Sequence, residues 1–158
     1  MPEKDLNRSD LELSVIVPLL DEAESISELA QKVHEALSGK HNYELIFFYF
    51  LSTDQSWQEI KKATKKMDHV LGIQLQRNYG KSSALQAGFE NANGRYIATM
   101  DADLQDDPNE IPLMLQQLKE EDLHLVSGWK KKRHDPISKT VPSRFFNKVT
   151  SLVTGITL

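Results

Sequence analysis

LSVIVPLLDE, residues 13–22, is a short run rich in β-branched residues that meets a proline and then two acidic residues. An apolar run of this length, bounded in this way, is typical of a buried strand, which we predict over residues 13–17. Apolar positions then recur at helical spacing over residues 21–37, with acidic residues in the first turn. The stretch therefore predicts a strand followed by a helix, with Asp21 and Glu22 at the junction.

Strands and helices are predicted to alternate along the rest of the chain. The predicted strands cover residues 43–51, 70–75, 96–100 and 123–127, and the predicted helices cover residues 53–66 (capped by Ser52), 81–91 and 109–121. This alternation indicates βαβ units, and so an α/β fold with a mainly parallel sheet. Ligands of such sheets bind beyond the carboxyl ends of the strands. Polar motifs follow the first four predicted strands, which predicts a single site: residues 21–22, 52–54, 77–78 and 101–107.

The composition excludes several classes of protein. The chain has 158 residues, 39% hydrophobic and 27% charged, which is enough for one domain with a core and argues against disorder throughout. A net charge of -4 gives no domain-wide basic field, so no nucleic acid partner is expected. The lack of cysteine excludes disulfides, thiolate metal sites and cysteine nucleophiles. We expect a cytoplasmic chain, because neither a membrane-spanning run nor a signal peptide is recognisable.

The segment 101–107, DADLQDD, concentrates four carboxylates directly after a predicted strand. Like charges this close repel one another unless a cation compensates for them. The Asp-x-Asp spacing of Asp101 and Asp103 suits one hard divalent cation, Mg²⁺ or Mn²⁺, that bridges the protein to the phosphates of a ligand. For Asp106 and Asp107 we favour a simpler role at the start of the helix that follows Pro108.

Two other motif interpretations fail at particular positions. An EF-hand starting at Asp101 needs Gly in its sixth place and Glu in its twelfth, where the chain has Asp106 and Pro112. Residues 80–82, GKS, end like a P-loop, but Leu75 occupies the place of the earlier glycine, so a nucleoside-triphosphatase is disfavoured. Lys81 either meets a phosphate near a helix N-terminus or is a solvated surface lysine, and both alternatives stay open.

Five segments in order resemble the motifs of family-2 glycosyltransferases. They are residues 14–26 (SVIVPLLDEAESI), 75–89 (LQRNYGKSSALQAGF), 100–108 (MDADLQDDP), 126–133 (VSGWKKKR) and 142–147 (PSRFFN). The last two resemble the branch of dolichyl- and undecaprenyl-phosphate sugar transferases. The resemblance implies a GT-A (Rossmann-like), mainly parallel sheet flanked by helices, here truncated. It also implies transfer of a sugar from a UDP- or GDP-sugar, with inversion, to a polyprenyl phosphate at the cytoplasmic face of a membrane.

The resemblance also implies roles for particular residues. Pro18, Leu20 and Glu22 match positions that contact the nucleobase and ribose, and Leu20 replaces the usual aromatic residue. The alternatives are packing for Pro18 and Leu20 and a helix-start role for Glu22. The remaining matches lie at the phosphates and the sugar: Asp101 and Asp103 as metal, diphosphate and catalytic carboxylates, Ala102 against the ribose, Gln105 as a sugar or second-shell contact, and Lys81 and Arg133 beside the phosphates.

One segment departs from the family pattern. Residues 49–54 are YFLSTD, where the family usually has D-D-G-S-T-D, so three large apolar residues replace two acids and a glycine. Either the strand extends and fills the pocket, or the apolar residues are exposed. We expect nucleotide affinity to be weakened or lost, and the alternative function is a non-catalytic remnant that binds metal or a partner.

The predicted organisation has three parts: a flexible stretch over residues 1–12, a nucleotide-sugar-binding domain over residues 13–135, and an amphipathic segment over residues 136–158. The chain stops inside an apolar-periodic segment, so we expect a piece of a longer protein.

Apolar residues of the last segment fall on one helical face, and a basic run, residues 130–133, precedes them. Together they would hold a membrane surface and a lipid phosphate, or the helix packs on its own domain or in a homo-oligomer.

Overall fold

The computed structural model describes residues 10–50, 54–75 and 80–128. The chain forms two compact units, Met1–Val126 and Ser127–Leu158, and every element below belongs to the first. Strands and helices alternate as the sequence predicts: β1 (Leu13–Leu19), α1 (Ile26–Leu37), β2 (Tyr43–Phe50), α2 (Ser56–Lys66), β3 (Val70–Leu75), α3 (Lys81–Asn91), β4 (Tyr96–Thr99) and α4 (Glu110–Glu120). No helix of these described residues is long and apolar enough to cross a membrane.

The four strands form one sheet in the order β3-β2-β1-β4, and every pair in it is parallel. The predicted α/β fold with a mainly parallel sheet is therefore confirmed. β1 lies inside the sheet, and all seven of its residues are buried, because helices cover both faces. The strand continues through Pro18 to Leu19, two residues beyond its predicted end.

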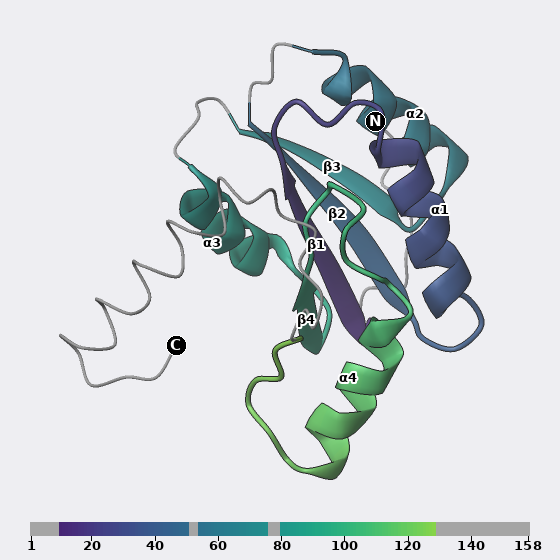
Figure 1. Ribbon diagram of the computed structural model, residues 1–158, viewed down its shortest axis with the longest axis vertical. Coiled ribbons are helices and arrows are strands. Elements are labelled where there is room, and N and C mark those ends of the chain that lie inside the picture. The colour runs from purple at the N-terminus through teal and green to yellow at the C-terminus, as the bar shows by residue number, and fades with distance from the viewer. Residues whose placement is uncertain (1–9, 51–53, 76–79, 129–158) are drawn as a thin grey trace, which may run out of the picture. The chain divides into compact units, whose positions relative to one another are not determined.

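Helices cover the two faces of the sheet (Figure 1). The larger core lies between the sheet and α1 and α2, and includes Val15, Phe47, Leu29 and Ile60. The smaller core joins Ile16 and Phe48 to Ala84 of α3 on the opposite face. Successive residues of β1 and β2 alternate between these cores, as the pleat of a strand requires.

The first helix starts later than predicted. Residues 21–25 form a turn in which the Glu22 carbonyl accepts hydrogen bonds from the backbone N–H and the hydroxyl of Ser25, and α1 begins at Ile26. Asp21 has a φ of 54°, a left-handed conformation that no α-helix continues. The acidic residues expected in the first turn therefore occupy a loop instead.

The fifth predicted strand is wrong. Residues 123–127 form no strand in the structure, and the side chain of Leu125 is 80% exposed. Alternation of apolar and polar residues suffices for a strand only where a neighbouring strand supplies hydrogen bonds and a core covers one face. Among the described residues, this segment has neither.

The buried carboxylate of Glu44, in β2, joins three segments at the amino end of the sheet. It is 1% exposed and accepts hydrogen bonds from Ser14 Oγ at 2.6 Å and from the backbone N–H of Asn93 at 2.8 Å. Ser14 Oγ in turn accepts a hydrogen bond from the backbone N–H of Gly94 at 2.8 Å. Gly94 has no room for a side chain, because a Cβ would lie 2.4 Å from the Ser14 nitrogen. The turn before β4 is thus held directly against β1 and β2.

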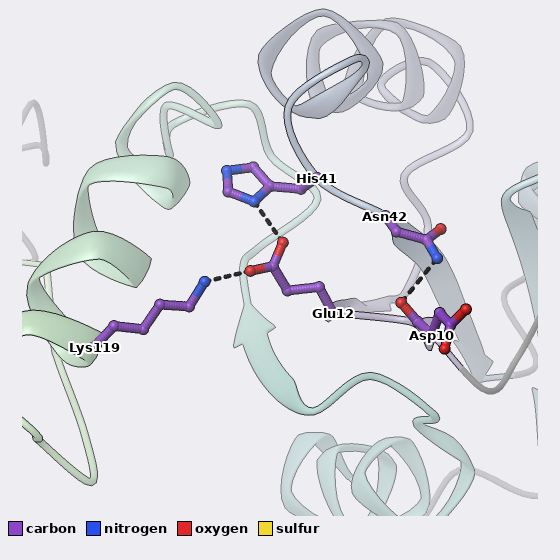
Figure 2. Close-up of polar contacts among 5 residues, drawn as sticks. All are labelled: Asp10, Glu12, His41, Asn42 and Lys119. Atoms are coloured by element: carbon purple, nitrogen blue, oxygen red, sulfur yellow. Dashed lines mark hydrogen bonds and ion pairs between the residues drawn. The ribbon is translucent and has the colours of Figure 1, made fainter.

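A second carboxylate at this end of the sheet links β1 to α4 (Figure 2). Glu12 accepts a hydrogen bond from His41 Nδ1 at 2.8 Å and a second from Lys119 Nζ. Asn42 donates to the backbone carbonyl of Asp10 nearby, at 2.9 Å. The hydrogen bonds from Lys119 and His41 lower the pKa of Glu12 below its usual value.

Replacing Glu12 by glutamine is expected to lower the free energy of unfolding at pH 7 but to change it little at pH 3. A carboxyl group with a lowered pKa in the folded state stabilises the fold above its unfolded pKa of about 4.3, and this contribution is lost as the pH falls through the folded value. Because these side chains are partly exposed, we expect a loss of only about 0.5–1 kcal/mol at pH 7. Urea unfolding at pH 7 and at pH 3 measures both effects. Glu90→Gln, on an exposed face of α3, is the control, and equal losses at both pH values would contradict the prediction.

Candidate active site

An acidic cleft of about 1210 Å³ lies at the carboxyl ends of β1 and β2. The loop after β1, the first turns of α1 and α2, and Leu104 from the loop after β4 line it. Its acidic lining residues are Asp21, Glu22, Glu24, Glu28, Asp54 and Glu59. The cleft lies at the edge of the sheet where parallel α/β folds bind their ligands.

Asp54 and Ser56 connect the loops after β1 and β2. The Asp54 carboxylate accepts hydrogen bonds from the backbone N–H of Ala23 at 3.0 Å and of Ser56 at 2.9 Å. The buried Ser56 hydroxyl accepts a hydrogen bond from the backbone N–H of Glu22 at 3.1 Å. Burial raises the pKa of Asp54, but the hydrogen bonds from Ser56 and Ala23 outweigh this effect, so the net shift is downward. Asp54 belongs to the polar segment 52–54 that the sequence places at the predicted site, whereas Ser56 was missed, although an Asp two residues before a Ser at a helix start is typical of such a turn.

The pKa of the Glu22 carboxyl is raised by burial and by the charges of three other acidic residues. Glu22 is partly buried, and the three acidic residues are Asp103, Asp54 and Asp21. Leu104, which follows Asp103 in the loop after β4, lines the cleft together with Glu22, so the fold brings the loops after β1 and β4 close together. A proton or a cation would relieve the repulsion among these carboxylates.

The acidic loop after β4 is anchored on the sheet by its apolar residues. Ala102 is buried, and Leu104 packs against the larger core with a φ of 60°. Asp103 is exposed, and its Oδ1 accepts a hydrogen bond from the Gln105 backbone N–H at 3.1 Å. Asp101 is partly buried, and its backbone N–H donates to Asp106 Oδ2 at 3.0 Å. The two carboxylates of the Asp-x-Asp motif thus belong to a loop whose backbone is held at several points.

Asp107 lies just before α4 but does not cap the helix, contrary to the role that the sequence favoured. Its Oδ1 accepts hydrogen bonds from the backbone N–H of Asn109 at 3.0 Å and from its side-chain Nδ2 at 2.9 Å. These two hydrogen bonds lower the pKa of Asp107. The N-cap position of α4 itself is Asn109, so Asp107 stabilises the turn that precedes the helix.

The other predicted contacts lie at different places around this edge. Pro18 is buried in β1, whereas Leu20 is 47% exposed beside the cleft residues Asp21 and Glu22. Gln105 lines a smaller hollow of about 370 Å³ together with Lys32 and is not among the lining residues of the acidic cleft. Lys81 is the first residue of α3, but its side chain, like the whole of Arg133, lies outside the described structure. The amphipathic segment and its basic run also lie outside it.

The first two residues of the apolar replacement, Tyr49 and Phe50, belong to β2. β2 continues through Phe50, and Tyr49 is 5% exposed with its ring centroid 5.5 Å from that of Trp57. The strand therefore includes Tyr49 and Phe50, while Leu51 lies outside the described residues. A carboxylate at residue 49 would face Trp57 and the core.

The carboxylates after β4 suit a cation that the protein binds together with the phosphates of a ligand, rather than a cation bound by protein side chains alone. Within the described ranges, no group of three or more His, Cys, Asp or Glu residues could hold a metal ion. Mg²⁺ commonly binds through one or two carboxylates, with phosphate and water oxygens completing its shell. Asp101 and Asp103 supply that number of hard oxygen ligands, so the residues present fit such an ion.

Comparison with known proteins finds similarity to sugar transferases and to one glycosyltransferase family. Residues 14–155 match the profile of a family described as glycosyl transferase family 2. A dodecaprenyl-phosphate galacturonate synthase of Rhizobium johnstonii is 40% identical over 151 residues, which are 94% of this chain and 45% of that protein. An undecaprenyl-phosphate 4-deoxy-4-formamido-L-arabinose transferase of Shewanella sediminis is 38% identical, over 91% of this chain and 44% of that protein. The chain thus spans less than half the length of these relatives.

Solved structures show the same fold. A mannosyltransferase from Pyrobaculum calidifontis in complex with GDP-Man and Mn²⁺ has a TM-score of 0.62 at 22% identity, over 75% of this chain and 34% of that one. S. aureus TarS 1-349 in complex with UDP-GlcNAc has a TM-score of 0.64 at 23% identity, over 81% of this chain and 38% of that one. At these identities the likeness concerns the fold, and it confirms the GT-A-type sheet expected from the sequence.

Proposed function

Because this chain belongs to glycosyl transferase family 2, we propose that it is the donor-binding part of an enzyme that transfers a sugar from a UDP- or GDP-sugar to a polyprenyl phosphate. The observation that carries the proposal is that the loops after β1 and β4 line one acidic cleft, with Glu22 on the first loop and Leu104, next to Asp103, on the second. A parallel sheet with two carboxylates at this edge suits a nucleoside diphosphate bound through a divalent cation. The named relatives, which act on polyprenyl phosphates, support the acceptor class.

We assign the donor contacts from the sequence positions that match the family's motifs. Leu20 and Glu22 would contact the base and ribose, with Pro18 behind them in β1, and Ala102 would lie against the ribose. Asp101 and Asp103 would hold Mg²⁺ or Mn²⁺, with Gln105 close to the sugar and Lys81 and Arg133 beside the phosphates. When bound there, the cation supplies Lewis-acid stabilisation of the charge on the departing diphosphate.

The transfer is a single displacement with inversion. An oxygen of the acceptor phosphate attacks the anomeric carbon, a new C–O bond forms, and the bond from that carbon to the donor diphosphate breaks. The electron pair leaves with the nucleoside diphosphate. Because the second pKa of a phosphate monoester is about 6, the acceptor is largely dianionic at neutral pH and needs little help from a general base. A lipid acceptor places the reaction at a membrane surface, for which we propose the cytoplasmic face.

Calorimetric titration of the chain with UDP, GDP and their sugar conjugates tests the donor site. We expect binding in the presence of Mn²⁺ that is lost with EDTA, and the preferred base identifies the donor class. Transfer from the preferred donor to undecaprenyl phosphate in detergent micelles then tests the acceptor. A folded sample, verified by circular dichroism, that binds none of these nucleotides with Mn²⁺ would overturn the proposal.

The buried Tyr49 supports a second candidate function, a chain that binds metal or a partner without transfer. The side chain packs on Trp57 where the family usually has an acidic residue, so one polar contact to the nucleotide is replaced by an apolar one. Mn²⁺ binding without any nucleotide binding in the same titration would favour this second function.

A further inference from the structure

One carboxylate of the acidic loop serves the backbone of that loop rather than the cleft. Asp106 Oδ2 accepts the hydrogen bond from the Asp101 backbone N–H at 3.0 Å. Asp106 lines the smaller hollow of about 370 Å³ with Lys32 and Asn109, and it is not among the lining residues of the acidic cleft. The hydrogen bond closes the loop from residue 101 to residue 106, so the backbone of Asp101 cannot rotate independently of the turn.

A second constraint acts in the middle of the same loop. Leu104 has a φ of 60°, a left-handed conformation that is unfavourable for a residue with a side chain. It is retained because the Leu104 side chain packs against the larger core, where it lines both the cleft and the hollow. On one side of this anchor lies Asp103, and on the other lie Gln105 and Asp106. The loop is thus held by an apolar anchor at its centre and by the hydrogen bond of Asp106 across its ends.

We propose that Asp106 is a positioning residue for the metal-binding motif. By accepting the Asp101 N–H, it holds residues 101–103 in the conformation in which both motif carboxylates reach one divalent cation. The inference rests on the proposed function, because it needs a cation at Asp101 and Asp103. The role requires an acceptor oxygen at the right place but no negative charge, so asparagine should replace Asp106 and alanine should not.

The test compares Mn²⁺-dependent binding of the preferred nucleoside diphosphate, UDP or GDP, among variants of the chain. We expect Asp106→Ala to weaken the affinity about 10-fold or more, the low end of the effect of removing a residue that supports metal ligands. Asp106→Asn should stay within about 3-fold of the unmodified chain, since its amide oxygen still accepts the N–H. Asp107→Ala is the matched control, because it removes the same charge from the next residue and leaves the acceptor of the Asp101 N–H in place.

Amide hydrogen exchange of Asp101, followed by NMR without metal or nucleotide, gives a second readout. We expect faster exchange in Asp106→Ala and an unchanged rate in Asp106→Asn and Asp107→Ala. If Asp106→Ala does not fold, Asp106→Gln, which moves the acceptor by one methylene, takes its place with the same expected losses.

The possible failures are distinguishable. Normal Mn²⁺-dependent affinity in Asp106→Ala would overturn the positioning role and leave the proposed function intact. Equal weakening in Asp106→Asn and Asp107→Ala would show that charge alone matters, and would also overturn it. If the unmodified chain shows no Mn²⁺-dependent binding, the proposed function and the positioning role both fail.

Discussion

Replacing Asp103 by alanine is expected to lower the Mn²⁺-dependent affinity of the chain for its nucleoside diphosphate by at least about 100-fold. The substitution removes one of two carboxylates that would hold the ion, and the interactions made by such an ion amount to several kcal/mol. A 100-fold loss corresponds to about 2.8 kcal/mol. Calorimetric titration with UDP or GDP at a fixed Mn²⁺ concentration measures the change directly.

The structure supplies a control and an internal check for this experiment. Asp107→Ala also removes one negative charge from this loop, but the Asp107 carboxylate is hydrogen-bonded to Asn109 at the start of α4. It should therefore bind the nucleotide normally. Asp103 is exposed, so its loss should leave the free energy of unfolding within about 0.5 kcal/mol of its original value. Full affinity in Asp103→Ala would remove the Asp-x-Asp motif from the donor site.

Glu44→Ala is expected to destabilise the fold by about 3 kcal/mol. The carboxylate is 1% exposed, and its removal leaves the buried Ser14 Oγ and the part-buried backbone N–H of Asn93 without their acceptor. Each buried donor left unsatisfied costs about 1–3 kcal/mol, and the desolvation of the charge that is no longer buried offsets part of the sum. Urea unfolding followed by circular dichroism measures the difference.

Two further variants separate the contribution of Glu44 from a general effect of losing a glutamate. Glu44→Gln keeps one acceptor oxygen and should lose less stability than Glu44→Ala. Glu90→Ala, at an exposed position of α3, should change stability by less than about 0.5 kcal/mol. A loss below 1 kcal/mol in Glu44→Ala would mean that the turn before β4 is held in place by other contacts.

Much of the fold was predictable because local patterns carried it. The run from Leu13 to Val17 is buried on both sides, and β3 and α3 have the predicted bounds. The family resemblance was likewise evident from short motifs in order, and the family match over residues 14–155 confirms it. Residues 123–127 were predicted wrongly because their alternating pattern does not reveal whether a neighbouring strand pairs with them.

The chain composition and residue order determine which groups are available: a parallel sheet, acidic residues after β1 and β4, and an apolar segment where the family usually has acids. The alternation of strands and helices also predicts that these loops share one edge of the sheet, but only the tertiary structure decides which individual groups pair there. It brings Asp103 within reach of Glu22, connects Asp54 and Ser56 to the loop after β1, and turns Asp106 toward the backbone of Asp101. A hydrogen bond depends on the positions of single atoms over a few ångströms, whereas Ala23 and Asp54 are far apart along the chain, so no local pattern records that pair.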